Sequence, residues 1–379
     1  METPFIYGRI AKSDDYTNRK EELARLKNNF TGLINTIIIS PRRWGKTSLV
    51  NRVSEILRKE QKKKMFICNV DVFNCRTEEQ FYTVFANAIL RASSSGWNEF
   101  VSGVKKYLGH FVPNITLSDK TQVYEFSFGV DFKDKNLSVD EILNLPQTIA
   151  KATGRKIIVC IDEFQNIHNY DNSLAFQQTL RAHWQLHDSV CYCLFGSKRH
   201  LLMNIFNNSD MPFYKFGDIL FLQKIKRSEW VSFISKRFAS TGKYISEDLS
   251  GEIADAMQNH PYYVQQYAQQ IWLRTKKKCD ETILQEALSD LVDQLSLLFA
   301  NIVNSLTTRQ INFLFAITDG EKNFSSKDVL EKYDFGASAN IKNIKNALLE
   351  KDLIDILPDN EIVLQDPVFG IWLQQNWRV

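Results

Sequence analysis

The sequence lacks several features that mark whole classes of protein. It contains no low-complexity tract and no run of about 18 apolar residues that would span a membrane. Its N-terminus has neither the basic start nor the apolar stretch of a secretion signal. Lys and Arg number 47 against 44 for Asp and Glu, so the net charge of +3 neither requires nor excludes a nucleic-acid partner. We therefore expect a cytoplasmic protein without membrane contact, whose 379 residues form about two to three domains.

The six cysteines also lack a pattern that would assign them a role. None forms a C-x-x-C pair, and no histidine lies near them at a spacing typical of a metal site. Four of them lie inside or at the ends of apolar stretches that resemble strands, where a free thiol behaves as a small buried hydrophobe. This usage favours a reducing compartment over a disulfide framework.

The sequence does contain a strong phosphate-binding motif. An apolar, β-branched run at 37–39 ends at Ser40, and Gly45, Lys46 and Thr47 then begin a stretch with helical periodicity. A strand, a short loop and a helix that starts at Gly-Lys-Thr form the context of a P-loop. A chance Gly-Lys-Thr on a surface helix is the weaker interpretation, because such a helix needs no preceding strand.

The chemistry of a P-loop predicts the role of each residue. Backbone N–H groups and the positive end of the helix would surround the phosphates. Lys46 would reach the β- and γ-phosphates, and the Thr47 hydroxyl would ligate Mg²⁺. Ser40 replaces the first glycine of G-x-x-x-x-G-K-[ST], and serine adopts positive φ less readily, so a different form of the turn is predicted. The candidate nucleotide-binding residues of the loop are Pro41, Arg42, Arg43, Trp44, Gly45, Lys46, Thr47 and Ser48.

A second motif follows more than 100 residues later. Five consecutive apolar residues, 157–161, indicate a strand buried on both faces, as in a parallel sheet. They end at Asp162 and Glu163, which places two carboxylates where such sheets bind ligands. Asp162 is suited to hold Mg²⁺ through its water shell, and Glu163 to orient and deprotonate the attacking water. An Asp-Glu pair alone is weak evidence, but downstream of Gly-Lys-Thr it is strong.

The next strand, 190–196, leads to two further candidates. Ser197 ends a strand expected beside the carboxylate strand, where it would sense the γ-phosphate, and Arg199 would add positive charge. Two alternatives stay open, namely Ser197 as a strand-ending cap and Arg199 as an exposed surface charge. The catalytic candidates are therefore Glu163, Lys46, Ser197 and Arg199.

The order of elements predicts three domains. An α/β core takes up residues 1–225, and the strict alternation of apolar residues within it predicts a β-hairpin insertion near 112–134. Residues 5–8 are predicted to be an edge segment that could close over a base, and the alternative is a simple covering helix. A helical lid follows over 226–300. In it Pro261 stands at the first turn of a helix, and His260 or its backbone is predicted to lie near the nucleotide.

Residues 301–379 carry the pattern of a winged helix, in which three helices precede a β-hairpin. The third helix has residue types that contact phosphates and base edges, but acidic neighbours weigh against a strong DNA surface. A protein-docking role is the alternative. The candidate DNA contacts are Asn340, Lys342, Asn343, Lys345 and Asn346.

Four segments resemble the archaeal-type ATPase family, which also occurs in bacteria and belongs to the STAND branch of AAA-related P-loop ATPases. They are residues 40–49, 161–165, 195–197 and 364–372. The resemblance implies a parallel core sheet with an added strand between the P-loop strand and the Asp-Glu strand, then an all-α lid and a C-terminal winged helix. It also implies ATP and Mg²⁺ as ligands.

Two further segments extend the resemblance to nearly the whole chain. Residues 18–23 match the family's N-terminal helix, and His260 with Pro261 resembles the proline motif of its lid. These matches add Arg19 and Pro261 to the candidate nucleotide-binding residues. Many relatives have Gly-Arg where this chain has Lys215 and Phe216, which weakens the case for an arginine role there.

The leading hypothesis is an ATP-hydrolysing molecular switch in which the γ-phosphate biases the lid and the winged helix. The alternatives are a winged-helix DNA-binding regulator and a protein-interaction adaptor, each with a mainly structural nucleotide site. The expected partners are ATP and, through the winged helix, duplex DNA or another protein, and the sequence leaves the oligomeric state open.

Overall fold

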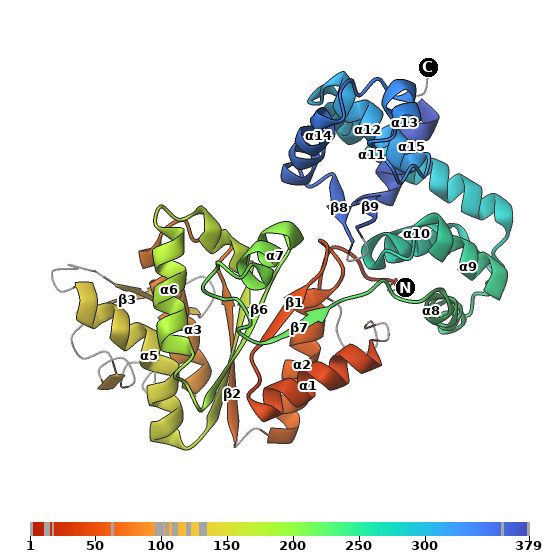
Figure 1. Ribbon diagram of the computed structural model, residues 1–379. Helices are drawn as coiled ribbons and strands as arrows, with labels where there is room; N and C mark the ends of the chain where they lie inside the picture. Colours follow the sequence, from red (N-terminus) through yellow and green to blue (C-terminus); the bar gives the residue numbers. More distant parts are fainter. Residues whose placement is uncertain are drawn as a thin grey trace. The chain divides into compact units, whose positions relative to one another are not determined.

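The computed structural model describes residues 3–10, 16, 19–61, 64–94, 102, 106–107, 113–118, 123–128, 135–357 and 360–376. Its contacts divide the chain into two compact units (Figure 1). The sheet unit consists of Lys20–Ser40 and Lys46–Leu222, and the helical unit consists of Met1–Arg19, Pro41–Gly45 and Gln223–Val379.

The sheet unit is built on a five-stranded sheet in the order β2-β5-β6-β1-β7, and every neighbouring pair in it is parallel. The strand β6 therefore lies between the P-loop strand β1 and the Asp-Glu strand β5, as the resemblance implied. The register brings Ile39 opposite Gly196, so the loops after β1 and β6 leave the same edge of the sheet. The strands are β1 Thr36–Ile39, β2 Met65–Asp71, β5 Lys156–Asp162, β6 Val190–Gly196 and β7 Asp218–Phe221.

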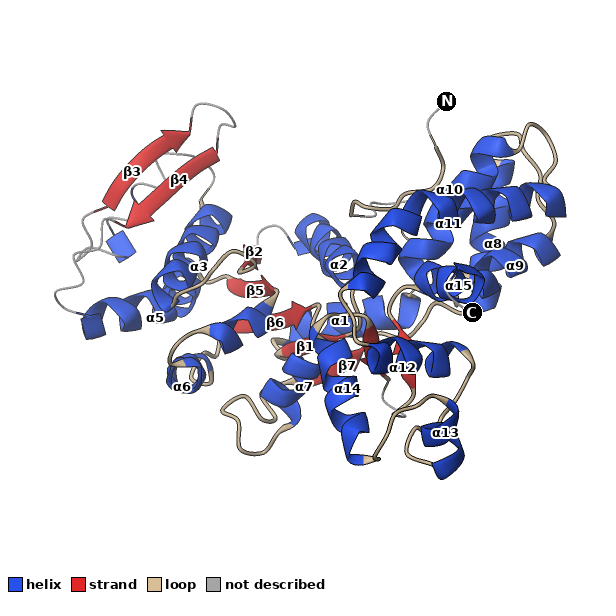
Figure 2. Cartoon of the chain, turned by 90° about the horizontal axis from the view of Figure 1, so that it is seen from above, coloured by secondary structure: helices blue, strands red, loops and turns tan. Residues whose placement is uncertain are grey.

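Helices cover this sheet on both sides. Ile37 and Ile39 of β1 belong to a core shared with α3, α5, α6 and α7, while the buried Ile38 between them points to the other face. On that other face α1 packs against α2. Figure 2 shows α3 and α5 together near β2 and β5. The helices are α1 Lys20–Gly32, α2 Lys46–Gln61, α3 Glu78–Ser93, α5 Lys135–Thr153, α6 Ser173–Trp184 and α7 Arg199–Asn207, with a 3₁₀ helix, η2, at Phe164–Asn169.

The predicted hairpin insertion appears as the antiparallel pair of β3 (Pro113–Ser118) and β4 (Val123–Phe128). The turn between these two strands lies outside the described residues. The pair lies between α3 and α5 in the chain, where it interrupts the alternation of strand and helix. It forms a separate two-stranded sheet and adds no strand to the five-stranded sheet.

The helical unit begins with four helices and continues into the winged helix. The predicted pattern of three helices and a hairpin is confirmed, because β8 and β9 pair antiparallel after α14. The first four helices are α8 Arg227–Ala239, α9 Glu247–Ala256, α10 Pro261–Arg274 and α11 Glu281–Asn304. The winged-helix elements are α12 Thr308–Thr318, α13 Lys327–Lys332, α14 Ala339–Glu350, β8 Ile354–Ile356 and β9 Ile362–Leu364, followed by α15 Pro367–Asn376.

Local sequence signals explain where these helices start. Asp280 caps α11 by accepting a hydrogen bond from the backbone N of Ile283, and Thr307 with Gln310 forms a reciprocal capping box at α12. The helix α11 runs past residue 300 and packs against both α10 and α15. One core thus continues from the predicted lid into the winged helix, and the domain boundaries at 226 and 301 remain predictions.

The expectation of an edge segment at residues 5–8 is wrong, because no strand forms there. The Phe5 ring is 1% exposed and packs edge-on against Phe233 and Phe238 of α8, at centroid distances of 6.2 and 5.8 Å. The backbone N of Ile6 donates to Gln265 Oε1 at 3.2 Å. The N-terminal segment is therefore part of the core of the helical unit.

All six cysteines are free and buried, which agrees with the absence of a disulfide framework. Burial raises the pKa of the Cys68 and Cys191 thiols well above their ordinary value. In the described part of the chain, no helix has both the length and the apolar character that crossing a membrane requires.

Candidate functional site

The P-loop lysine is buried at the start of α2. Lys46 is 6% exposed, and its ammonium donates hydrogen bonds to the Ser40 carbonyl oxygen at 3.1 Å and to Ser40 Oγ at 3.2 Å. Burying an ammonium is unfavourable unless acceptors surround it. Ser40 supplies two such acceptors, so it fixes the position of the Lys46 side chain.

Positive φ falls elsewhere in the loop, so Ser40 needs no left-handed backbone. Arg43 (φ 62°) and Gly45 (φ 87°) take the left-handed conformations, and Ser40 does not. A side chain on Gly45 would meet no atom within 4 Å, so the backbone conformation, rather than space, favours glycine there. At position 40 a serine therefore fits, and its hydroxyl adds a contact to Lys46 that glycine lacks.

The first carboxylate of the Asp-Glu pair is bonded to the P-loop helix. Thr47 Oγ1 donates to Asp162 Oδ2 at 2.9 Å, and the backbone N of Glu163 donates to Asp162 Oδ1 at 2.8 Å. Burial raises the pKa of Asp162 to about 6, although these hydrogen bonds and Lys46 oppose the shift. Hydroxyl and carboxylate oxygens are the ligands that Mg²⁺ prefers, so Thr47 and Asp162 fit the metal role predicted for them.

The second carboxylate meets the residue that follows β6. Glu163 follows β5 in a left-handed conformation (φ 55°), and its Oε2 accepts hydrogen bonds from Ser197 Oγ at 2.9 Å and Ser197 N at 3.3 Å. The Ser197 hydroxyl thus binds the predicted catalytic carboxylate. Its role as a sensor of the γ-phosphate and the alternative of a strand-ending cap both remain predictions.

Arg199 begins α7 and is 7% exposed. The alternative of an exposed surface charge is therefore wrong. A buried guanidinium needs polar partners, which favours a specific structural or functional role over a solvated one. Its catalytic role remains a prediction, as does a nucleotide contact from Ser48, the third residue of α2.

Sequence reasoning missed Gln165 in this unit. The side chain is 1% exposed, and its Nε2 donates to Glu163 Oε2, the same oxygen that Ser197 binds. A glutamine two residues after a strand carries no chemical signal of its own. Only its place in the segment 161–165 drew attention to it.

In the helical unit Arg19 holds the backbone of the P-loop. Its Nη2 donates to the Trp44 carbonyl oxygen at 2.9 Å and its Nη1 to the Gln223 carbonyl oxygen at 3.0 Å. The side chain is 7% exposed. The observed role of Arg19 is thus to position the loop, and a direct nucleotide contact from it remains a prediction.

The proline motif of the lid has the predicted structural role. Pro261 is the first residue of α10, and His260 caps that helix by accepting a hydrogen bond from the Tyr262 backbone N at 3.3 Å. Burial, with the positive charges of Lys224 and Arg43, lowers the pKa of His260 to about 3, so the imidazole is neutral. Trp44 packs edge-on against this ring at 6.2 Å.

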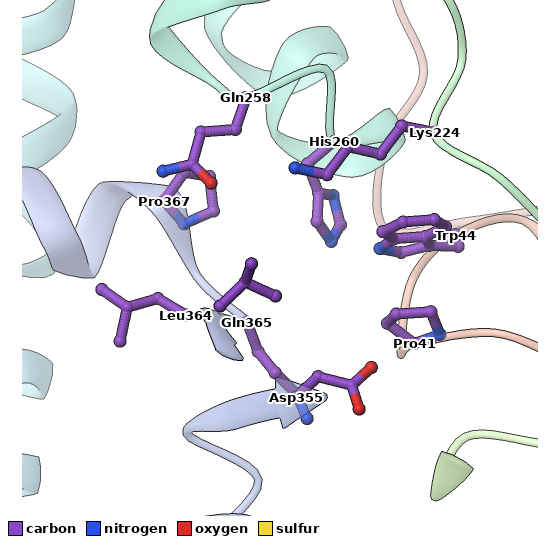
Figure 3. Close-up of a pocket in the computed structure, with 10 residues that line it drawn as sticks. Pro41, Trp44, Lys224, Gln258, His260, Asp355, Leu364, Gln365 and Pro367 are labelled. Atoms are coloured by element: carbon purple, nitrogen blue, oxygen red, sulfur yellow. The ribbon is translucent and has the colours of Figure 1, made fainter. Parts of the chain in front are cut away.

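Figure 3 shows a small cavity of about 20 Å³ among these residues, which leaves room for about one water molecule. Pro41 and Trp44 line one side, His260 and Lys224 another, and Asp355 of β8 points into it. The cavity joins the P-loop residues of the helical unit to the winged helix, but it is too small for a nucleotide.

A chain of polar contacts runs from the loop to the last helix. Arg43 Nη1 donates to the Tyr263 hydroxyl at 3.3 Å, and burial together with the nearby Asp366 carboxylate raises the pKa of that hydroxyl. Asp366 Oδ1 in turn accepts from the backbone N of Val368 at 2.9 Å and of Phe369 at 3.1 Å, at the start of α15. Burial raises the pKa of Asp366, with these hydrogen bonds opposing the shift. Sequence reasoning did not name Tyr263 or Asp366, although residues 364–372 contributed to the family resemblance.

A larger cavity of about 240 Å³ lies along this chain. Arg42, Arg43, Tyr263, Lys351 and Asp366 are among its lining residues. Both arginines are exposed, so they do not need the cavity to satisfy their charges. The Arg43 guanidinium also lies over the Tyr262 ring at 4.6 Å.

Comparisons with known proteins agree with this fold. Residues 44–180 match the KAP family P-loop domain, and residues 297–375 match a probable winged helix domain. The chain therefore contains a P-loop NTPase domain and a winged helix. No curated protein matches the sequence.

Two solved structures share the fold at low sequence identity. The Walker-type ATPase PABY2304 of Pyrococcus abyssi superposes with a TM-score of 0.65 at 16% identity, over 98% of this chain and 100% of that chain. The ORC2 protein of Aeropyrum pernix, solved as ADPNP-ADP complexes, gives a TM-score of 0.53 at 15% identity over 98% of both chains. The predicted resemblance to an archaeal P-loop ATPase is confirmed at the level of the fold, and the STAND assignment remains a prediction.

The raised pKa of Asp162 predicts how its charge affects stability. A carboxyl group whose pKa is raised by folding favours the folded state below its ordinary pKa of 3.8, and this contribution is lost as the pH rises through about 6. Asp162→Asn, which cannot ionise, should therefore increase the free energy of unfolding by about 1–3 kcal/mol near pH 7.5. The advantage should shrink toward about pH 4.

Urea unfolding followed by circular dichroism at several pH values measures this difference. Asp71→Asn is the matched control, because Asp71 ends the neighbouring strand β2 opposite Asp162 but is exposed. Equal stability of Asp162→Asn and the wild type near pH 7.5, with the same pH dependence, would contradict the prediction.

Proposed function

We propose that the protein binds ATP with Mg²⁺, hydrolyses it, and uses the bound nucleotide as a molecular switch. The observation that carries this proposal is the convergence of Lys46, Thr47, Asp162, Glu163 and Ser197 at the carboxyl ends of β1, β5 and β6. In a parallel sheet this edge is where ligands bind.

Each of these side chains fits one part of phosphoryl transfer. Lys46 would bind the β- and γ-phosphates, and the loop after Ser40 would offer its backbone N–H groups to them. Thr47 and Asp162 would hold Mg²⁺, which neutralises charge on the phosphate oxygens. Glu163 would orient and deprotonate the attacking water. The ORC2 protein, which shares the fold and was solved as ADPNP-ADP complexes, supports an adenine nucleotide as the ligand.

The switch is supported by the chain of polar contacts in the helical unit. Arg43 lies three residues before Lys46 in the same loop, and its guanidinium is hydrogen-bonded to Tyr263. The Tyr263 hydroxyl lies near the Asp366 carboxylate, which accepts hydrogen bonds at the start of α15. A nucleotide that repositions the loop would change the contact of Arg43. The hydrogen bonds that the half-buried Asp366 carboxylate accepts at the start of α15 would change in turn. Through them the nucleotide would affect the end of the winged helix.

Substitution of Glu163 tests the hydrolysis. Glu163→Gln should lower ATP turnover by about 100-fold or more, because the amide cannot accept the proton of the attacking water. Nucleotide affinity should stay close to that of the wild type, while Lys46→Ala should lose it. Phosphate release and equilibrium binding of a fluorescent ATP analogue measure the two effects. Glu79→Gln, an exposed carboxylate on α3, is the control. A wild type that neither binds nor cleaves ATP would refute the proposal.

Removal of one hydroxyl group tests the switch. Tyr263→Phe keeps the buried ring but breaks the chain between Arg43 and Asp366. In the wild type, ATP should change the hydrogen-exchange rates of the first amides of α15, Val368 and Phe369, and this response should disappear in the variant.

Tyr262→Phe is the matched control, because Arg43 contacts the ring of Tyr262 rather than its hydroxyl. Hydrogen exchange read by mass spectrometry, with and without ATP, separates the two variants. An ATP response that persists unchanged in Tyr263→Phe would show that the chain does not transmit the nucleotide state.

DNA binding by the winged helix is the second candidate function. Lys342, Asn343 and Asn346 are exposed on α14, as a recognition helix requires. Asn340 is less available, because its Nδ2 donates to the Phe335 carbonyl oxygen at 3.2 Å. The alternative proposed for this domain is that the same helix binds a protein partner.

The two candidates for the winged helix differ in their dependence on salt. If α14 binds duplex DNA, Lys342→Ala with Lys345→Ala should weaken binding and lower the slope of log K against log salt concentration by about 1 for each lost phosphate contact. Lys327→Ala on α13, an exposed lysine paired with Glu331, is the control. Fluorescence anisotropy with a labelled duplex measures the binding, and absence of binding at low salt would favour the protein-docking role.

A further inference from the structure

We propose that Gln165 is a positioning residue for the hydrolysis reaction, and that it acts by holding one oxygen of the Glu163 carboxylate so that the other is presented to water. This inference rests on the proposed hydrolysis. It adds to that reaction a residue that lies outside the P-loop, the Asp-Glu pair and the strand β6. The substrate water is the one that Glu163 would deprotonate.

The hydrogen bonds to Glu163 are distributed unequally over its two oxygens. Three donors converge on Oε2, namely Gln165 Nε2, Ser197 Oγ and Ser197 N. Oε1 accepts no hydrogen bond from any residue that the structure describes, and it is not a buried unpaired atom. A general base needs one fixed acceptor that a water molecule can reach, and this arrangement leaves Oε1 as that acceptor.

The fold holds Gln165 in place through its neighbours. Glu163 turns the chain with its left-handed backbone, and the Asn166 backbone N donates to the Glu163 carbonyl oxygen at 2.9 Å to close the turn. Phe164 is fully buried and stacks on Phe206 at 5.7 Å. The Gln165 side chain therefore returns toward Glu163 from a rigid 3₁₀ helix.

Gly196 makes room for this side chain. A Cβ atom on Gly196 would lie 1.7 Å from Gln165 Oε1 and 3.2 Å from Glu163 Cα. The φ of Gly196 is not positive, so the requirement for glycine is steric. The segments 161–165 and 195–197 are thus complementary, because the glycine of one accommodates the glutamine of the other.

The amide orientation follows from the acceptors around it. Reversing the amide would turn Oε1 toward Glu163 Oε2, and two acceptors would then face each other. In the observed orientation Gln165 Oε1 is buried and has no hydrogen-bond partner among the described residues. An unpaired buried carbonyl oxygen is unfavourable for stability. If this position served packing alone, methionine would be more favourable than a glutamine with an unpaired carbonyl oxygen. The N–H bond to Glu163 is therefore the feature that explains a glutamine here.

The test is to replace Gln165 by methionine, which has a similar shape but no N–H group. Loss of one hydrogen bond to a charged carboxylate should lower kcat for ATP by about tenfold or more. The KM for ATP and the affinity for a non-hydrolysable ATP analogue should stay within about twofold of the wild type, because Gln165 acts only through Glu163. The melting temperature should not fall, because the unpaired Oε1 is removed together with the N–H group.

Gln177→Met is the matched control. Gln177 on α6 is also a fully buried glutamine whose Oε1 is unpaired, but its Nε2 donates to Ser173 Oγ rather than to Glu163. This variant should keep the wild-type kcat. In the Glu163→Gln background, Gln165→Met should have no further effect on the residual single-turnover rate, because the group that it positions is already gone.

A pH profile adds a signature that a packing role would not produce. In Gln165→Glu, a protonated carboxyl group can donate to Glu163 Oε2 as the amide does, whereas an ionised one repels it. The activity of Gln165→Glu relative to the wild type should therefore rise as the pH is lowered from about 8 to about 6, and that of Gln165→Met should not.

The outcomes separate this inference from the proposed function. A wild type that hydrolyses ATP while Gln165→Met keeps the same kcat would overturn the role of Gln165 alone. A fall in kcat accompanied by an equal loss of nucleotide affinity and a lower melting temperature would also overturn it, in favour of a structural role. Absence of hydrolysis in the wild type would overturn the proposed function and this inference together.

Discussion

The hydrogen bond from Thr47 to Asp162 is the interaction on which the sheet unit's site depends. It joins the start of α2 to the end of β5 across β6, which lies between β1 and β5 in the sheet. Burial keeps the pKa of Asp162 near 6, so the carboxylate is held at a free-energy cost that the surrounding apolar core must offset. The buried Lys46 ammonium has the same requirement and meets it through Ser40. A sheet with helices on both faces supplies the rigidity that such groups need.

Residues of the P-loop make contacts in both units of the chain. Its ends, Ser40 and Lys46, belong to the sheet unit, while Pro41–Gly45 belongs to the helical unit. Arg19 binds the Trp44 carbonyl oxygen, and Arg43 donates to Tyr263. Arg43 therefore has a partner within the protein, and the residues between Ser40 and Gly45 do more than surround a phosphate.

The sequence predicted the parts of this structure that depend on local pattern. Apolar runs located the strands, and the carboxylates after 157–161 and the polar Ser197 were correctly placed at strand ends. It could not reveal that Arg199 is buried, because a single arginine at the start of a helix has the same local pattern whether it is exposed or enclosed. The motif also did not state which positions of the loop take positive φ, and these are Arg43 and Gly45 rather than Ser40.

The missed residues share a different cause. Gln165, Tyr263 and Asp366 carry side chains that are common in solvated loops and helices, and each gains its significance from a partner that the fold brings near. Tyr263 and Asp366 lie about 100 residues apart in sequence, so no spacing rule connects them. Gln165 lies next to the recognised carboxylates, yet its bond to Glu163 depends on the left-handed backbone of Glu163 and on the absence of a side chain at Gly196.

These contacts also bear on how the P-loop would serve the proposed switch. Lys46 and Arg43 are separated only by Trp44 and Gly45, and the Trp44 carbonyl oxygen is fixed by Arg19. A phosphate that draws Lys46 away from Ser40 would therefore strain a short, anchored link whose other end, Arg43, is hydrogen-bonded to Tyr263 of α10. Because the link is short, the nucleotide contact and the Arg43 contact cannot vary independently, and this dependence is the physical basis that the proposed switch requires.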